Sequence, residues 1–439
     1  MIVLKFGGTS IADADQIRAV GDILEKCLTR KPVVILSALS GVTDTLIRLA
    51  QEALEKGSKS IDPIRRRHQK VIQALGIEED IVGDLLQDYR ELLKGISLVK
   101  ELTPRSLDYA MSFGERFSVR IIAAHLCQRG IPAEPIVSYD IGLHTDAQFG
   151  KALPLPDLDG PIAKAIRGLK KVPVITGFIG KAGPGGDVTT LGRGGSDYSA
   201  AIIGSAIGAE EIQIWTDVDG IMTADPEIVP DARPIDILSF DEASELAYFG
   251  ARVIHPSTMI PAIKKSIAIR VLNTYRPEAP GTLVVRERPP GAQVVRSIAH
   301  KRNITLINIV STRMLQQHGF MARVFEVFAR REIVIDLIST SEVSVSISTD
   351  SKGGLDDLVE EISEFGRVTL EREKTIICVV GQGMRDAVGV AARIFESLGE
   401  AGVPVRLITQ GATRINISLV VENRDVEPAV RALHRAFFD

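Results

Sequence analysis

The sequence has little of what disulfide-bonded, metal-binding or membrane-spanning proteins use. Its 439 residues include only three cysteines, Cys27, Cys127 and Cys378, and seven histidines without an HxxxH pair. An odd number of widely spaced cysteines offers neither a disulfide framework nor a metal-ligand spacing, so we expect a reducing, cytoplasmic environment and no resident metal site. No apolar run approaches about 18 residues, which argues against a membrane span.

A strong charge imbalance is also missing. Lys and Arg total 52 and Asp and Glu total 56, for a net charge of −4. This balance gives no electrostatic reason to bind nucleic acid or an anionic membrane. We therefore interpret the basic run "RRRHQK" at positions 65–70 as a solvated helix face.

Two common nucleotide-binding loops are absent as well. No segment matches GxxxxGK[ST], which excludes a P-loop enzyme. The stretch "GQGMRD" resembles a dinucleotide-binding loop, but Asp386 stands where the third glycine belongs. We therefore expect no NAD.

Alternating strand and helix patterns run through residues 1–285. Apolar segments such as "PVVIL" and "EEIQIW" end in turns of small residues, and a helix-like segment separates such strands. This order predicts a mainly parallel sheet covered by helices on both faces. Residues 44–130 are periodic and poor in strand signals, so we expect a helical subdomain there. The cluster of Pro, Gly and charged residues at 276–293 is typical of a linker.

Beyond that segment the chain repeats itself. Residues 324–348 align with 394–418 at an offset of 70 without a gap, and Gly319 aligns with Gly389. Each copy reads strand, glycine-led helix, strand, strand, helix. The pattern predicts two βαββαβ modules, one inserted in the other: 310–376 for the first, and 294–309 with 377–439 for the second.

Residues that suit phosphate chemistry gather at the expected carboxyl ends of the parallel strands, where open α/β sheets bind ligands. Lys5 precedes Gly7 and Gly8, and glycine-rich turns let backbone N–H groups converge on phosphate oxygens. These loops carry no histidine and no paired carboxylates to act as a base. A carboxylate acceptor needs no base, because it is already ionised at pH 7. Arg193 suits such a carboxylate, and Asp197 can pair with both Lys5 and Arg193. Residue types alone thus indicate phosphoryl transfer to a small acidic acceptor.

The motifs "KFGGTS", "SFGERFS", "TTLGRGGSDYSAA", "WTDVDGIMTADP" and "FGARVIHP", in this order and spacing, resemble those of the aspartate kinases of the amino-acid-kinase superfamily. The C-terminal repeats resemble the ACT domains of that family. The resemblance covers essentially the whole chain. It implies an α/β fold with a three-layer αβα kinase domain and two ACT-type regulatory modules. It also implies transfer of the γ-phosphoryl group of MgATP to the side-chain carboxylate of L-aspartate, with Mg²⁺ brought by the nucleotide.

The resemblance also implies site residues. Catalytic roles fall to Lys5 and Asp197. Aspartate would be bound by Thr43, Glu115, Phe178, Arg193, Gly194, Gly195 and Ser196. ATP would be bound by Lys5, Gly7, Gly8, Ser37, Thr216, Asp217, Met222, Asp225 and Arg252. An amino-acid effector, lysine or threonine, would be bound by Met314, Gly319, Phe320, Met321, Asp336, Ser341 and Glu342.

Departures from the family pattern keep two alternatives open. Met222 stands where a tyrosine is common, and Glu227 where an arginine is common. The alternatives are a kinase of another acidic amino acid, and an amino-acid sensor with weak catalysis.

We further expect the chain to be at least a homodimer through its ACT-type modules, because pairing of the modules would cover a sheet edge.

Overall fold

The computed structural model describes residues 1–250, 256–289, 293–314 and 318–439. The chain divides into two compact units. The first comprises Met1–Ile221, Asp236–Phe240 and Val253–Arg288, and the second comprises Met222–Ile235, Asp241–Arg252 and Pro289–Asp439. No helix in the described part of the chain is both long enough and apolar enough to cross a membrane.

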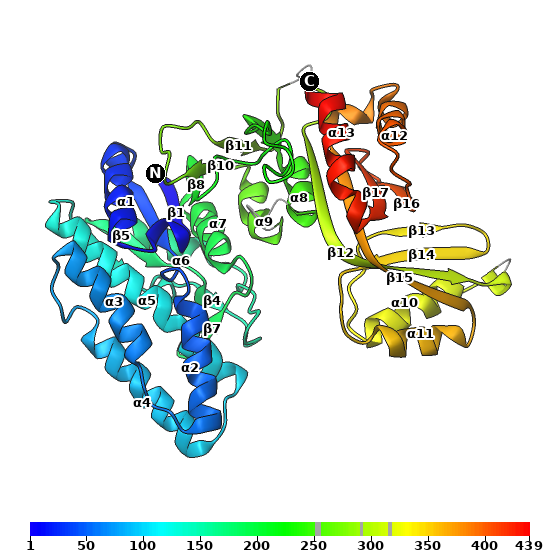
Figure 1. Cartoon of the computed structure of the whole chain (residues 1–439). Helices are drawn as coiled ribbons and strands as arrows, with labels where there is room; N and C mark the ends of the chain where they lie inside the picture. The colour runs from blue at the N-terminus through cyan, green and yellow to red at the C-terminus, as the bar shows by residue number, and fades with distance from the viewer. Residues whose placement is uncertain (251–255, 290–292, 315–317) are drawn as a thin grey trace. The chain divides into compact units, whose positions relative to one another are not determined.

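An eight-stranded sheet forms the centre of the first unit (Figure 1). In spatial order its strands are β3 (Ala133–Ile136), β5 (Val172–Thr176), β2 (Pro32–Leu36), β1 (Ile2–Phe6), β8 (Glu211–Thr216), β10 (Ala268–Asn273), β11 (Thr282–Val285) and β9 (Ile237–Ser239). All neighbouring pairs are parallel except β10 with β11. The α/β fold with a mainly parallel sheet is therefore confirmed. One detail of the prediction is wrong. The segment predicted to be a linker contains strand β11.

Helices cover this sheet on both faces. One layer contains α1 (Ala14–Cys27) and α5 (Pro104–Gln128), and the other contains α6 (Asp159–Arg167), α7 (Gly195–Ile207) and α9 (Pro256–Lys265). A small sheet of β4 (His144–Thr145), β6 (Ile179–Ala182) and β7 (Val188–Thr190) completes the unit.

The two faces of strand β1 meet different layers. Ile2, Leu4 and Phe6 belong to the core shared with helices α1 to α5. Val3 lies on the opposite face under α7, where a Cβ placed on Gly204 would be 3.6 Å from Val3 Cγ2. Side chains alternate along a strand, so Lys5 shares the face of Val3 and points toward the layer that contains α7.

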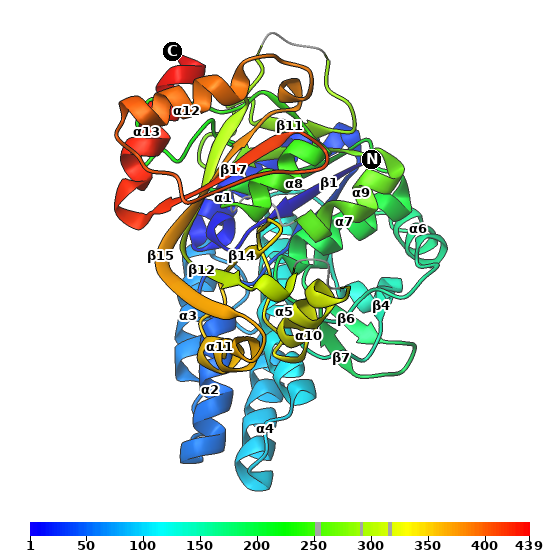
Figure 2. The ribbon, with the colours of Figure 1, turned by 90° about the vertical axis from the view of Figure 1, so that its right-hand side faces the viewer.

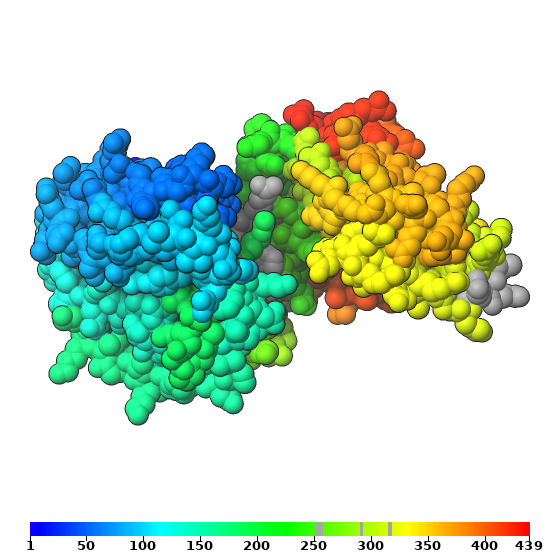
Figure 3. Space-filling model, turned by 90° about the horizontal axis from the view of Figure 1, so that it is seen from below, coloured from blue at the N-terminus to red at the C-terminus, as the bar shows by residue number. Residues whose placement is uncertain are grey.

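Four helices lie in the segment for which the sequence predicts a helical subdomain: α2 (Val42–Lys56), α3 (Asp62–Leu75), α4 (Gly83–Val99) and α5. Figure 2 shows α2 and α4 extending away from the sheet, and their surfaces form a continuous blue-to-cyan face in Figure 3. His68 corrects the interpretation of "RRRHQK" as a solvated face, because this side chain is fully buried and packs 4.5 Å from the ring of Phe117. The arginines beside it remain half-buried or exposed.

A six-stranded antiparallel sheet forms the second unit. Its spatial order is β13 (Ile338–Thr340), β14 (Ser344–Thr349), β12 (Ser297–Val310), β15 (Arg367–Val380), β17 (Asn416–Glu422) and β16 (Leu407–Gln410). The helices are α10 (Phe320–Arg330), α11 (Leu355–Ser363), α12 (Val390–Glu400) and α13 (Val426–Phe438). Helices α10 and α11 pack on one half of this sheet, and α12 and α13 on the other half (Figure 1).

The internal repeat is visible in the helix starts. Gly319 precedes α10 with φ of 82°, and Gly389 precedes α12 with φ of 87°. A side chain would strain both positions, so the aligned glycines follow from backbone geometry. Strands β12 and β15 pair with each other along both halves of the sheet, and their register shifts between Lys301 and Leu306. The fold thus contains two βαββα copies that share two long central strands.

Candidate active site

Lys5 and Asp197 form a nearly buried ion pair at the centre of the first unit. Lys5 Nζ lies 2.6 Å from Asp197 Oδ1, and the two side chains are 11% and 13% exposed. The strand brings Lys5 toward α7, and Asp197 lies in the first turn of that helix. Helix N-termini carry partial positive charge, so Lys5 and α7 together make a favourable place for an anion.

Glycines allow the loops around this pair to approach closely. A Cβ on Gly8 would lie 2.9 Å from the carbonyl oxygen of Ala38, in the loop that follows β2. A Cβ on Gly195 would lie 2.7 Å from Phe178 Cδ2. Gly7 leaves space too, since its Cβ would lie 3.7 Å from Lys5 Nζ. Larger residues at Gly8 or Gly195 would push these loops apart, whereas Gly7 has room for a Cβ.

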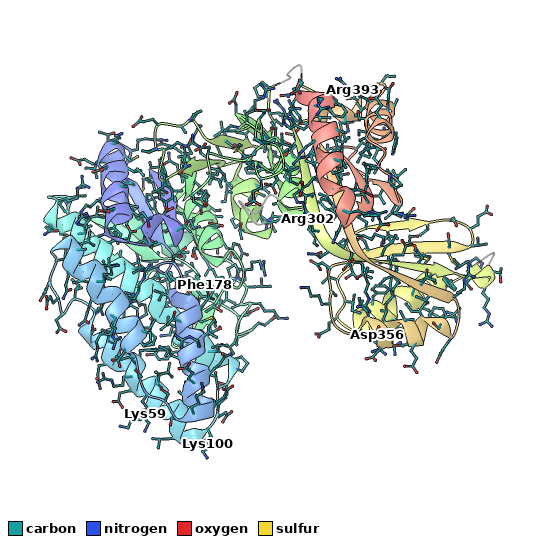
Figure 4. The ribbon with its side chains drawn as sticks, in the orientation of Figure 1. Lys59, Lys100, Phe178, Arg302, Asp356 and Arg393 are labelled. Atoms are coloured by element: carbon teal, nitrogen blue, oxygen red, sulfur yellow. The ribbon has the colours of Figure 1, made fainter. Side chains whose placement is uncertain are left out.

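A cavity of about 360 Å³ opens beside the ion pair. It is lined by Lys5, Gly8, Ser37, Ala38, Leu39, Ser40, Gly41, Thr43, Asp44, Glu115, Phe178, Gly192, Gly194, Gly195, Ser196 and Asp197. Phe178, labelled in Figure 4 close to the start of α2, has φ of 65° and donates its N–H to Ser199 Oγ of α7 at 3.0 Å. The Ser37 hydroxyl donates to Ser196 Oγ at 3.0 Å. The structure thus brings most of the predicted aspartate-binding residues to one cavity.

Glu115 is the buried carboxylate of this cavity. It lies on α5 and is 3% exposed. The backbone N–H of Ala38 donates to its Oε1 at 3.0 Å, whereas its Oε2 has no hydrogen-bond partner in the described part of the chain. Burial raises the pKa of Glu115 to about 8. A buried carboxylate with a free oxygen is a place where a bound cation is stabilising.

Arg193 differs from what the sequence predicts. Its side chain is exposed, and it is not among the residues that line the cavity, although Gly192 and Gly194 on either side are. The expected pairing of Asp197 with Arg193 is not found among the described residues; Asp197 pairs with Lys5 instead. The reason is topological, because the side chain of Lys5 emerges from β1 directly at the start of α7.

The predicted nucleotide residues divide between the two units. Thr216 ends β8, and its hydroxyl donates to Asp217 Oδ1 at 3.1 Å. Met222 and Asp225 belong to the second unit, where the carbonyl oxygen of Met222 accepts from the Ser297 hydroxyl at 2.7 Å. The N–H of Glu227 donates to Asp225 Oδ1 at 2.9 Å. Arg252 lies outside the described residues.

The predicted effector residues all lie in the second unit. Gly319 and Phe320 begin α10, and Met314 and Met321 pack against the core beneath it. Ser341 and Glu342 are exposed in the turn before β14.

Asp336 is the carboxylate of this set whose side chain is buried. The side chain of Asp336 is inaccessible to solvent, and its Oδ1 lies 2.7 Å from Lys301 Nζ and accepts from the Tyr248 hydroxyl at 2.8 Å. Asp336 Oδ2 has no hydrogen-bond partner in the described ranges.

Sequence reasoning misses three polar residues of these regions: Asp108, Tyr248 and Lys301. Tyr248 ends α8 (Phe240–Tyr248), and Lys301 lies on β12. Each is far from its partner in the chain, so no local spacing indicates the contact. A polar residue inside an otherwise apolar segment is the one signal available, as with Asp108 in the apolar face of α5.

Comparisons with known proteins agree with this geometry. Residues 1–273 match the model of the amino acid kinase family, and residues 307–354 and 377–437 match an ACT domain model. Aspartokinase 3, chloroplastic, of Arabidopsis thaliana is 41% identical over 100% of this chain and 81% of that protein.

Two solved structures of Escherichia coli aspartokinase III are similar over the full length of both chains, each with 34% identity. One, in complex with aspartate and ADP (R-state), has a TM-score of 0.83. The other, in complex with lysine and aspartate (T-state), has a TM-score of 0.81. With a family match over more than half of its length and a full-length relative at this identity, the chain belongs to the aspartokinases of the amino acid kinase family.

Proposed function

We propose that this chain phosphorylates L-aspartate with ATP, giving 4-phospho-L-aspartate and ADP, at the cavity between Lys5 and Glu115. The observation that carries the proposal is the free Oε2 of Glu115 in the same cavity as the Lys5–Asp197 ion pair. An amino-acid acceptor has one cationic group and two anionic groups, and the cavity offers a partner for each kind of charge.

The acceptor would bind with its ammonium group against Glu115. In the absence of a cation, burial raises the pKa of Glu115 to about 8, so the protonated form predominates at neutral pH. A bound ammonium group lowers that pKa, because opposite charges favour the ionised form. Thr43 and Ser196 provide hydroxyl groups at the same cavity, and Arg193 would hold a carboxylate by turning its side chain toward it while its backbone stays in place.

The transfer itself needs positioning and charge stabilisation. One oxygen of the aspartate side-chain carboxylate attacks the γ-phosphorus, and the bond to the bridging oxygen of ADP breaks. Lys5 Nζ neutralises charge on the transferring group, and Asp197 orients that ammonium. The carboxylate is ionised at neutral pH, so no proton has to be removed.

ATP would bring Mg²⁺ with it. In the described ranges no group of three His, Cys, Asp or Glu residues is placed to hold a metal ion. Phosphate oxygens and retained water molecules would supply most of the ligands of the ion, because Mg²⁺ gives up its water reluctantly.

For regulation we propose lysine as the effector, bound at Asp336 of the first module. E. coli aspartokinase III has been solved with lysine, and threonine is the alternative. Asp336 Oδ2 is free to accept from an effector ammonium group. The equivalent position of the second module is Arg406, which already pairs with Glu422 at 3.0 Å. A second cation is disfavoured there, so the first module would be the sensor.

The decisive experiment offers MgATP and a panel of acceptors: L-aspartate, L-glutamate and N-acetyl-L-glutamate. Hydroxylamine traps an acyl phosphate as a hydroxamate, and ADP release is measured in parallel. We expect aspartate to give the highest kcat/KM. A preference for glutamate or acetylglutamate would indicate another acid kinase, and no turnover with any acceptor would indicate a sensor. The predicted cytoplasmic location stays a prediction, since the Arabidopsis relative is chloroplastic by name.

A further inference from the structure

We propose that Asp108 is a positioning residue that sets the length of acceptor this site prefers. It does so by fixing the loop that carries Arg193 to the same helix that carries Glu115. The inference rests on the proposed function, because it takes Glu115 and Arg193 as the contacts for the two ends of the acceptor.

Asp108 is a buried carboxylate that accepts three hydrogen bonds, two from Thr190 of β7 and one from Gly150. It is 1% exposed, and in the described part of the chain it has no ion-pair partner. Its Oδ2 accepts from the N–H of Thr190 at 2.8 Å and from the N–H of Gly150 at 2.9 Å. Its Oδ1 accepts from the Thr190 hydroxyl at 2.9 Å. Burial raises the pKa of Asp108, and the three hydrogen bonds oppose that effect.

These donors tie together the base of the loop around Arg193. Thr190 is the last residue of β7 and stands three positions before Arg193. The N–H of Ala152 donates to the carbonyl oxygen of Thr190 at 2.9 Å, so the loop at 146–152 and the end of β7 are bound to each other. A Cβ on Gly192 would lie 3.1 Å from the carbonyl oxygen of Gly150, which shows how closely the two loops pack.

The three hydrogen bonds that Asp108 accepts form a clamp on the base of the Arg193 loop. Helix α5 connects this clamp to Glu115. Asp108 and Glu115 are seven residues apart, which is about two helical turns and roughly 10 Å along the axis. Residues at this spacing share one face of a helix. The carboxylate that would receive the acceptor ammonium and the carboxylate that fixes the Arg193 loop are therefore set on one rigid element.

A fixed separation of the two contacts favours acceptors of one length. Aspartate and glutamate carry the same charged groups and differ by one methylene, so charge alone does not separate them. If the loop is released from Asp108, Arg193 can occupy a wider range of positions. Aspartate binding then weakens, and the preference for aspartate over glutamate falls.

Three substitutions test this clamp. Asp108→Asn keeps the shape but turns an amide toward backbone N–H groups, so at least one hydrogen bond is lost. Thr190→Val removes only the hydroxyl donor, and Thr190→Ser keeps that donor. Asp187→Asn is the matched control, because Asp187 is exposed just before the same strand and its ion pair with Arg105 of α5, at 3.4 Å, is a surface contact that contributes little.

Steady-state kinetics are measured for aspartate, glutamate and ATP. We expect Asp108→Asn and Thr190→Val to raise KM for aspartate about fivefold or more, as for the loss of one buried hydrogen bond. KM for ATP should stay within twofold of the wild type, and the ratio of kcat/KM for aspartate over glutamate should fall. Thr190→Ser should restore both values, and Asp187→Asn should resemble the wild type.

The proposal is overturned if both test variants keep the wild-type KM and specificity ratio, or if KM for ATP rises as much as KM for aspartate. A role in folding alone would lower thermal stability without changing the specificity ratio. If Asp108→Asn does not fold, the comparison of Thr190→Val with Thr190→Ser decides. A wild type that does not phosphorylate aspartate refutes the proposed function, whereas an active wild type with unaltered variants refutes only the role of Asp108.

Discussion

Glu115→Gln provides the sharpest test of the acceptor site. The carbonyl oxygen of Gln can still accept from the Ala38 N–H, as Glu115 Oε1 does at 3.0 Å. Its amide group would then take the place of the free Oε2 and present donors to an ammonium group that also donates. The substitution removes a charge-assisted hydrogen bond while the shape of the cavity is retained.

Hydrogen bonds to charged groups contribute about 1.5–3 kcal/mol. Since about 1.4 kcal/mol corresponds to a factor of ten, KM for aspartate should rise about 10- to 100-fold. KM for ATP should change little, because Glu115 is assigned to the acceptor alone. The assay is steady-state ADP release at varied aspartate and saturating MgATP, with Glu101→Gln as a control at an exposed carboxylate just before the same helix.

An aspartate KM within twofold of the wild type would refute the assignment of the ammonium group to Glu115. A rise in KM for ATP alone would mean that Glu115 serves the other substrate.

Four further predictions follow from the structure. Lys5→Ala should lower kcat by roughly 100-fold or more with little change in KM for aspartate, measured by ADP release; near-normal turnover would contradict a role in the transfer. Asp336→Ala should abolish inhibition by lysine in a titration of activity, whereas Asp356→Ala, at an exposed carboxylate of α11, should not. Burial lowers the pKa of His68 from 6.5 to about 4, because the folded protein disfavours the charged ring. The contribution of His68 to the free energy of unfolding is therefore fully present above about pH 6.5 and is lost as the pH falls through about 4. His68→Phe should therefore flatten the fall in melting temperature over this range, and an unchanged slope would contradict this account. Light scattering should give at least twice the mass of one chain, and a monomer would contradict the predicted association of the regulatory modules.

Much of the fold can be predicted from the sequence because its signals are local. Apolar runs such as Ile2–Phe6 and the small-residue turns after them indicate parallel strands without any knowledge of distant contacts. The repeat at an offset of 70 indicates both regulatory copies, because each helix start needs a glycine at Gly319 or Gly389. Strand β11 escapes this reasoning, since only its pairing with β10 and β9 distinguishes this short apolar segment from a linker.

The candidate site is predictable where one strand and one helix start determine it, and not where side chains from distant elements meet. Lys5 and Asp197 follow from the motifs, and their side chains lie 2.6 Å apart. Tyr248 and Asp336 are 88 positions apart in the sequence. Their contact depends on how α8 packs on the six-stranded sheet of the second unit. The exposure of Arg193 likewise depends on the backbone conformation of its loop, which sets the direction of the guanidinium group and is not indicated by the amino-acid composition.

The shared central strands of the second unit have a consequence for engineering. Asn303 in β12 and Glu373 in β15 have φ of 62° and 55°, and they stand where the register of the two strands shifts. A chimera that grafts the half of this sheet carrying α10 and α11 onto a relative therefore needs two splice points, one at each of these residues. A single crossover would combine a strand from one parent with a partner strand from the other along half of its length. Recombination libraries that cut once within the sheet should consequently yield few folded regulatory units.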